Sequence, residues 1–166
     1  MQRMWALAAT AVLWAVSGAP ASAAPPPPLT CNGNINGHVS ASYTGTTLTS
    51  TTSNYDATMV CTRGLHGEPM TSLQETALVY LNGSVVRTGV LGQCAGSQPC
   101  LSVESKGNYV CSSTCGGDYR MAHRAVMVLP PNHEWGTPPA GCTKIDTRKL
   151  QCLWFSGTVH VQPVLG

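Results

Sequence analysis

The residues of this chain with the greatest capacity for chemistry are its eight cysteines. Two of them stand four positions apart within residues 109–120 (YVCSSTCGGDYR), where a redox pair, a metal clamp and a disulfide are the competing interpretations. A thioredoxin-type redox pair has the spacing C-x-x-C and lowers the pKa of its thiolate at a helix N-terminus. Zinc sites repeat closely paired ligands. Neither pattern surrounds Cys111 and Cys115, so we expect structural disulfides.

The N-terminal residues 1–23 (MQRMWALAATAVLWAVSGAPASA) have the pattern of a secretory signal peptide. Arg3 precedes a short apolar run, and the final Ala-Ser-Ala matches a signal-peptidase site. The apolar run is shorter than the about 20 residues of a membrane-spanning helix. We therefore predict cleavage after Ala23 and a secreted, extracellular protein without membrane insertion. Residues 24–30, with four consecutive prolines, form an extended proline-rich spacer.

An even number of cysteines in an exported chain indicates a disulfide framework. Cys94 and Cys100 bracket a short loop, and Cys142 and Cys152 flank a hairpin with a polar tip, so each of these two pairs is predicted to be bonded. Eight cysteines allow about 105 pairings, and sequence does not decide the others. For the remaining four cysteines we favour Cys61–Cys111 and Cys31–Cys115.

The spacing of apolar residues predicts short strands rather than helices. Residues 75–89 (ETALVYLNGSVVRTG) hold the strongest hairpin signal, two β-branched runs joined by Asn82-Gly83. Residues 118–129 alternate strictly, with Tyr119 and His123 on the same face. Asn32-Gly33 and Asn36-Gly37 are expected to be turns.

The flanking strands complete the expected fold class. Residues 38–44 and 46–50 are rich in serine and threonine and are predicted to be edge strands, and residues 57–62 a better-defined strand. Many short strands separated by turns indicate an all-β, disulfide-stapled β-sandwich over residues 31–166.

Two sequence patterns resemble known families. The run Gly107-x-Tyr109-x-Cys111, with Cys61 in an earlier strand, resembles the tyrosine corner of immunoglobulin-like domains, although no tryptophan lies between the two cysteines. The order VYLNGSVVRTG, a short Cys94–Cys100 loop, CGGDYRMAHRAVMVLPP and WGTPPAGC resembles small secreted, uncharacterised proteins of actinobacteria. This resemblance implies a secreted immunoglobulin-like sandwich and assigns no functional residues.

Charge and motif content argue against several functional classes. Lysine and arginine number nine against seven aspartate and glutamate, which leaves no basic stripe for a nucleic acid. The chain contains neither a G-x-S-x-G nucleophile elbow nor an H-E-x-x-H zinc motif. The five histidines are scattered, and whether they converge on a metal is left open. We therefore expect no enzyme activity, no catalytic residue, no cofactor and no metal.

Recognition through surface loops is the function that remains. Residues 131–139 (PNHEWGTPP) present His133, Glu134 and Trp135 between prolines, and a stiff loop loses little entropy on binding. Residues 62–72 form a second charged loop. We predict an extracellular binding or structural module. Its partner is unknown, and a protein is one of the candidates. A secreted protease inhibitor using the Cys94–Cys100 loop is the alternative, and the oligomeric state is undetermined.

Overall fold

A computed structural model describes residues 29–63, 67–113 and 115–164. The predicted signal peptide (1–23) and residues 24–28 of the spacer lie outside the described residues. The described part forms nine strands: β1 (Cys31–Thr44), β2 (Thr47–Cys61), β3 (Met70–Leu81), β4 (Ser84–Thr88), β5 (Gly92–Cys100), β6 (Ser102–Cys111), β7 (Gly117–Val128), β8 (Cys142–Lys144) and β9 (Lys149–Val161). Among these residues no helix is long and apolar enough to cross a membrane.

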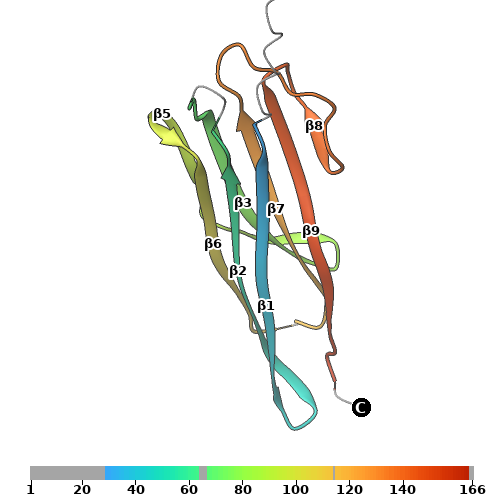
Figure 1. Cartoon of the computed structure of the whole chain (residues 1–166). Helices are drawn as coiled ribbons and strands as arrows, with labels where there is room; N and C mark the ends of the chain where they lie inside the picture. The colour runs from blue at the N-terminus through green and yellow to red at the C-terminus, as the bar shows by residue number, and fades with distance from the viewer. Residues whose placement is uncertain (1–28, 64–66, 114, 165–166) are drawn as a thin grey trace, which may run out of the picture.

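The strands form two antiparallel sheets, which confirms the all-β prediction (Figure 1). The smaller sheet has the order β1-β2-β6. The larger sheet has the order β4-β3-β7-β9-β8, and β5 pairs with β3. The two sheets lie face to face, because the buried side chains of both sheets meet in shared clusters.

The strongest local predictions are confirmed. Asn82 and Gly83 join β3 to β4 with φ of 50° and 81°, the left-handed pair that a type I′ hairpin turn needs. On β7, the face that carries Tyr119 and His123 is buried in the interior, as the alternating pattern predicted. Both predictions concern neighbours in sequence, where the chain itself fixes the geometry.

The predicted turns at Asn32-Gly33 and Asn36-Gly37 are wrong, because both dipeptides lie inside the continuous strand β1. Their glycines instead allow the two sheets to approach each other closely. A Cβ added to Gly33 would lie 2.3 Å from His123 Cε1, and one added to Gly37 would lie 1.7 Å from the Met121 sulfur. The predicted edge strand at 46–50 is the start of β2, whose pairing with β6 begins only at Thr51, so residues 47–50 pair with the single strand β1.

All four disulfides join cysteines of the described part, and they indicate an oxidising, extracellular-type environment. The predicted bonds Cys94–Cys100 and Cys142–Cys152 are confirmed. The predicted bonds Cys61–Cys111 and Cys31–Cys115 are wrong, and the actual pairs are Cys31–Cys61 and Cys111–Cys115.

Strand register explains the error in pairing. Cys31 lies directly opposite Cys61 at one end of β2, whereas Cys111 lies opposite Thr51. Ten residues of extended strand between Thr51 and Cys61 measure about 33 Å, far beyond the reach of a disulfide. Cys111 must therefore bond within its own loop, and it does so with Cys115.

The loop closed by Cys111–Cys115 is tied to both sheets through a buried tyrosine. The Tyr119 hydroxyl, at the start of β7, donates to the Cys115 carbonyl at 2.9 Å and lies 2.8 Å from Thr51 Oγ1 of β2. Burial raises the pKa of the Tyr119 phenol above its ordinary value. The bond from a tyrosine hydroxyl to the backbone that was predicted for Tyr109 is therefore found at Tyr119 instead.

We expect Gly33→Ala to destabilise the fold by about 1–3 kcal/mol, because the added methyl group overlaps the enclosed His123 ring. Gly136→Ala is the matched control, since a Cβ there meets nothing within 4 Å. Urea unfolding of the two variants measures the difference. Equal free energies of unfolding in both variants would contradict the close packing of β1 on β7.

Candidate functional site

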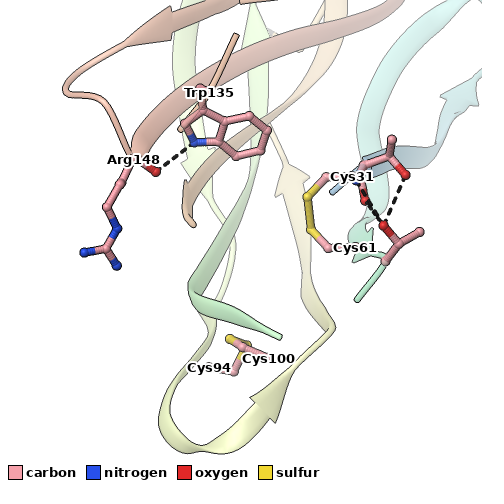
Figure 2. The surroundings of a disulfide bond; sticks show 8 residues. Cys31, Cys61, Cys94, Cys100, Trp135 and Arg148 are labelled. Atoms are coloured by element: carbon pink, nitrogen blue, oxygen red, sulfur yellow. Dashed lines mark hydrogen bonds between the residues drawn. A yellow bond between two sulfur atoms is a disulfide. The ribbon is translucent and has the colours of Figure 1, made fainter. Parts of the chain in front are cut away.

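The loops predicted to bind lie together at one end of the molecule. Residues 62–69 connect β2 to β3, and residues 129–141 connect β7 to β8. Ser72 near the start of β3 pairs with Val128 at the end of β7, so the first connection ends beside the point where the second begins. The disulfides Cys31–Cys61 and Cys94–Cys100 are drawn at this end in Figure 2, near Trp135. We call this surface the loop end.

An ion pair links the two connections. His133 Nε2 lies 3.1 Å from Glu68 Oε1, and the other ring nitrogen of His133 lies 3.1 Å from the Pro131 carbonyl. Both side chains are about a quarter exposed, at 28% and 22%. The structure thus brings together one residue from each predicted loop, although His66 of the first loop lies outside the described residues.

Trp135 anchors its loop rather than projecting from it. The indole is half-buried against the core, and its Nε1 donates to the Arg148 carbonyl at 2.8 Å (Figure 2). Arg148 in turn donates to the Leu129 carbonyl through Nε and Nη2. Glu134, between His133 and Trp135, is exposed. Of the three predicted binding residues, Glu134 is therefore the one that faces solvent most openly.

The loop proposed for protease inhibition is part of the same end. Residues 92–100 form β5, whose Cys94 pairs with Leu73 and whose Cys100 pairs with Met70. The disulfide closes a short irregular segment in which Gly96 has φ of 87°. The described residues here therefore form a short segment that a disulfide closes at the edge of β3.

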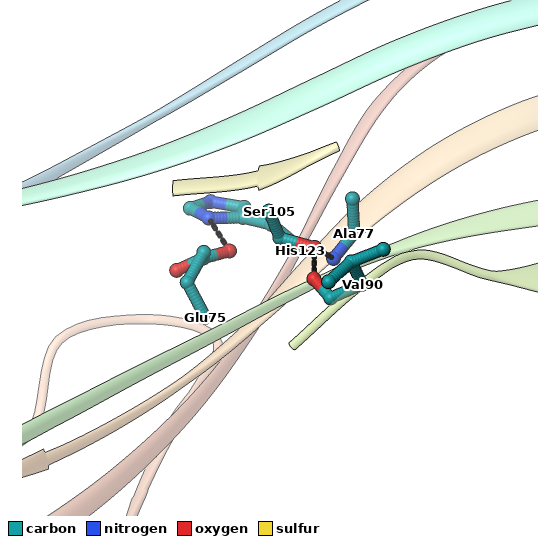
Figure 3. Close-up of polar contacts among 5 residues, drawn as sticks. All are labelled: Glu75, Ala77, Val90, Ser105 and His123. Carbon is teal, nitrogen blue, oxygen red and sulfur yellow. Dashed lines mark hydrogen bonds and ion pairs between the residues drawn. The ribbon is translucent and has the colours of Figure 1, made fainter. Parts of the chain in front are cut away.

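The most deeply buried charged group lies elsewhere, on β3. Glu75 Oε1 is 3.0 Å from His123 Nδ1, and the two side chains are 0% and 4% exposed (Figure 3). The His123 ring also stacks on Trp154, with centroids 4.7 Å apart. Burial raises the pKa of the Glu75 carboxyl, and the hydrogen bond from His123 partly offsets this effect.

This buried contact is suited to structure more than to catalysis. Glu75 Oε2 is buried and has no hydrogen-bond partner among the described residues. A histidine oriented by a carboxylate could serve as a general base, but a base must come within hydrogen-bond reach of its substrate. Side chains so completely enclosed cannot do so. Among the described residues, no group of three or more histidine, cysteine, aspartate or glutamate side chains is placed to hold a metal.

A serine hydroxyl near this pair bonds to a backbone amide at the edge of β3. Ser105 Oγ accepts a hydrogen bond from the Ala77 amide at 2.9 Å and donates to the Val90 carbonyl (Figure 3). Ser105 belongs to β6 in the smaller sheet, and Ala77 to β3 in the larger one. This buried serine therefore joins the two sheets by a polar contact.

One further hollow, which no sequence pattern predicts, lies on the outer face of the larger sheet. Arg120 lies over the Phe155 ring at 4.2 Å, and Tyr80 meets the same ring edge-on at 5.3 Å. With Gly83, Asp118 and Thr158 these residues line a cavity of about 310 Å³. They come from three strands and from the β3–β4 turn, so only register brings them together.

Comparison of the chain with protein-family models, characterised proteins and solved structures finds no match. Arguments about function therefore rest on the geometry described above.

We expect Glu75→Gln to change the pH dependence of stability. Because burial raises the pKa of Glu75, the folded state favours the protonated acid, which glutamine mimics. The contribution of Glu75 is fully present below the ordinary pKa of glutamate and is lost as pH rises through the raised value. The variant should therefore gain stability relative to the parent as pH increases.

Urea unfolding between acid and neutral pH measures this difference. Glu104→Gln is the matched control, because Glu104 stands on the exposed face of β6 beside Lys106. A difference between the Glu75 variant and the parent that stays constant across the pH range would contradict the assignment.

Proposed function

We propose that the described domain is an immunoglobulin-like β-sandwich. Such domains place strands A, B and E in one sheet and strands C′, C, F and G in the other. The order β1-β2-β6 corresponds to A-B-E, and β4-β3-β7-β9 corresponds to C′-C-F-G. The short strand β8 is an insertion between F and G on this interpretation.

The position of Tyr119 supports the same proposal. The tyrosine corner of immunoglobulin-like domains uses a tyrosine near the start of strand F, whose hydroxyl bonds to backbone a few residues upstream. Tyr119 lies near the start of β7, and its hydroxyl donates to the Cys115 carbonyl. An inter-sheet B–F disulfide is replaced here by packing of β7 side chains against β1 and β2.

We propose that the protein is a secreted binding module that recognises its partner through the loop end. The observation that carries this proposal is the number of bonds that fix the loops: the Glu68–His133 ion pair, the Trp135–Arg148 hydrogen bond and the adjacent disulfides. Loop residues that such bonds already hold in place lose little entropy on binding. In immunoglobulin variable domains the B–C and F–G loops, which correspond to 62–69 and 129–141, form the binding end.

Site-specific photo-crosslinking tests the location of the binding surface. A benzoylphenylalanine probe replaces Glu134 at the loop end, and a matched probe replaces Thr46 in the exposed β1–β2 turn at the opposite end. Each labelled protein is irradiated with the surface and extracellular fluid of the producing cells. We expect a discrete adduct from position 134 and none from position 46. An adduct from position 46 alone would place recognition at the other end and overturn the proposal.

Protease inhibition is a second candidate, favoured by the short segment that the Cys94–Cys100 disulfide closes. A stapled segment of this kind holds a substrate-like conformation at low entropic cost. Titration against a panel of serine proteases separates the two functions. We expect no loss of protease activity at an equimolar ratio, whereas stoichiometric inhibition would favour the inhibitor.

A further inference from the structure

The smaller sheet has one covered edge and one open edge. On the β6 side, the Val90 amide donates to the Lys106 carbonyl at 3.0 Å, and Gly92 lies so close that an added Cβ would be 2.0 Å from the Glu104 carbonyl oxygen. Residues 89–92 therefore cover that edge. On the other side, β1 pairs with β2 alone among the described strands. A row of β1 backbone groups thus faces outward.

The open edge lacks most of the features that normally discourage pairing, and the one irregularity of the β1–β2 pair is a register shift between Ser42 and Tyr43. Exposed edge strands are usually short, charged, bulged or interrupted by proline. Strand β1 is 14 residues long, and its sequence, CNGNINGHVSASYT, contains no lysine, arginine, aspartate, glutamate or proline. In the larger sheet, β4 has five residues including Arg87 and β8 has three including Lys144. Because β8 pairs only with residues 150–152 of β9, the rest of β9 is an edge on the same side of the molecule as β1.

The inner surface beside this edge is also uncovered. Ala41 lies opposite Thr51 on the inward face of β1, yet Ala41 is exposed whereas Thr51 is buried. Val159 of β9 lies opposite the fully buried Tyr119 and is itself 46% exposed. Two inward-facing side chains, one from each sheet, therefore remain in contact with solvent.

The arrangement of the sheets explains this exposure. Strand β1 ends the smaller sheet and packs over β7 and β9, whereas the larger sheet continues through β9 to β8 (Figure 1). The larger sheet therefore extends beyond the smaller one by about one strand. Near one end of β1 the two sheets are joined again, where the Tyr43 hydroxyl donates to the Gln162 carbonyl at 2.9 Å.

We propose that β1 is a strand-acceptor site for an extended peptide segment of another protein. The segment would bond to the open edge of β1, as in other cases of β-strand addition, and would lie over β9. Its residues facing inward would be small and apolar to cover Ala41 and Val159. It would be uncharged, because β1 offers no charge to pair with one, and free of proline where its amides bond.

A second copy of this protein fits the edge less well than a lone strand. Pairing of β1 with β1 of another copy would bring that copy's larger sheet over the same side. The projecting β9 and β8 already occupy the space that the second β9 would need. A single extended strand brings no second sheet with it. This site is separate from the loop end, so the two proposals can fail independently.

Binding of a synthetic strand to the folded protein tests this proposal. The probe is a fluorescent, uncharged peptide without proline in which alanine or valine alternates with threonine, so that one face is small and apolar as the site requires. Fluorescence anisotropy measures the affinity, and amide hydrogen exchange measures protection along β1. We expect alternate β1 amides to exchange rapidly in the free protein and to become protected when the peptide is added.

Two single-lysine variants locate the bound strand. Ala41→Lys places a charge on the inward face, where the peptide would bury it, and should weaken binding at least about tenfold. Ser42→Lys places the same charge on the outer face of the same strand and should bind like the parent. Both positions are exposed in the free protein, so neither lysine is buried on folding.

Three results would overturn the proposal. The first is slow exchange of every β1 amide in the free protein, which would show that the edge is closed. The second is an absence of peptide binding to the parent, or equal binding to Ala41→Lys and the parent. The third is a dimer of the parent, measured by sedimentation and lost in Ala41→Lys, which would assign the edge to a second copy.

Discussion

The buried contact between Glu75 and His123 is the constraint on which the interior depends. A carboxyl group that has left water needs a hydrogen-bond partner, because an unsatisfied buried polar group is costly. Glu75 finds its partner on the adjacent strand β7, at 3.0 Å. The imidazole in turn fills the space that Gly33 leaves open in the opposite sheet and stacks on Trp154. Four strands are therefore positioned by one polar contact.

The pair also divides the core. On one side lies a cluster centred on Leu73 and Met127, which includes three of the disulfide cysteines that are fully or nearly fully buried. On the other side lies a cluster centred on Val79 and Tyr119. The first cluster supports the loop end, and the second supports the loop closed by Cys111–Cys115. Replacing a buried ion pair by apolar residues is often neutral or stabilising, so its value here lies in fixing which residues face each other.

Much of the local geometry could be predicted from the sequence, whereas register could not. The exception is the local bond Cys111–Cys115, whose cysteines were assigned to long-range partners instead. The hairpin at Asn82-Gly83 and the bonds Cys94–Cys100 and Cys142–Cys152 join residues close in the chain, and all three were predictable. The Cys31–Cys61 bond depends on how two long polar strands align, which their composition does not specify. The same limit applies to Arg120, Tyr80 and Phe155, which register alone assembles.

The wrong turn predictions in β1 come from the two uses of glycine. Asn-Gly is a turn signal because glycine tolerates positive φ, but Gly33 and Gly37 are used for the absence of a side chain. The two uses look identical in the sequence. What distinguishes them is the bulky residue that fills the vacated space, here His123 and Met121, which lie 90 and 84 residues further along the chain.

The Cys31–Cys61 bond has a consequence for the alignment of β1. A strand pair rich in asparagine, serine and threonine can slide, and a shift of one residue turns every side chain to the opposite face. Here such a slip would carry Asn36 and His38 inward and expose Ile35. Because the disulfide joins residues that lie directly opposite each other, it prevents a shift in the pairing of β1 with β2. It acts as a pin for the register of the hairpin, in addition to closing a loop.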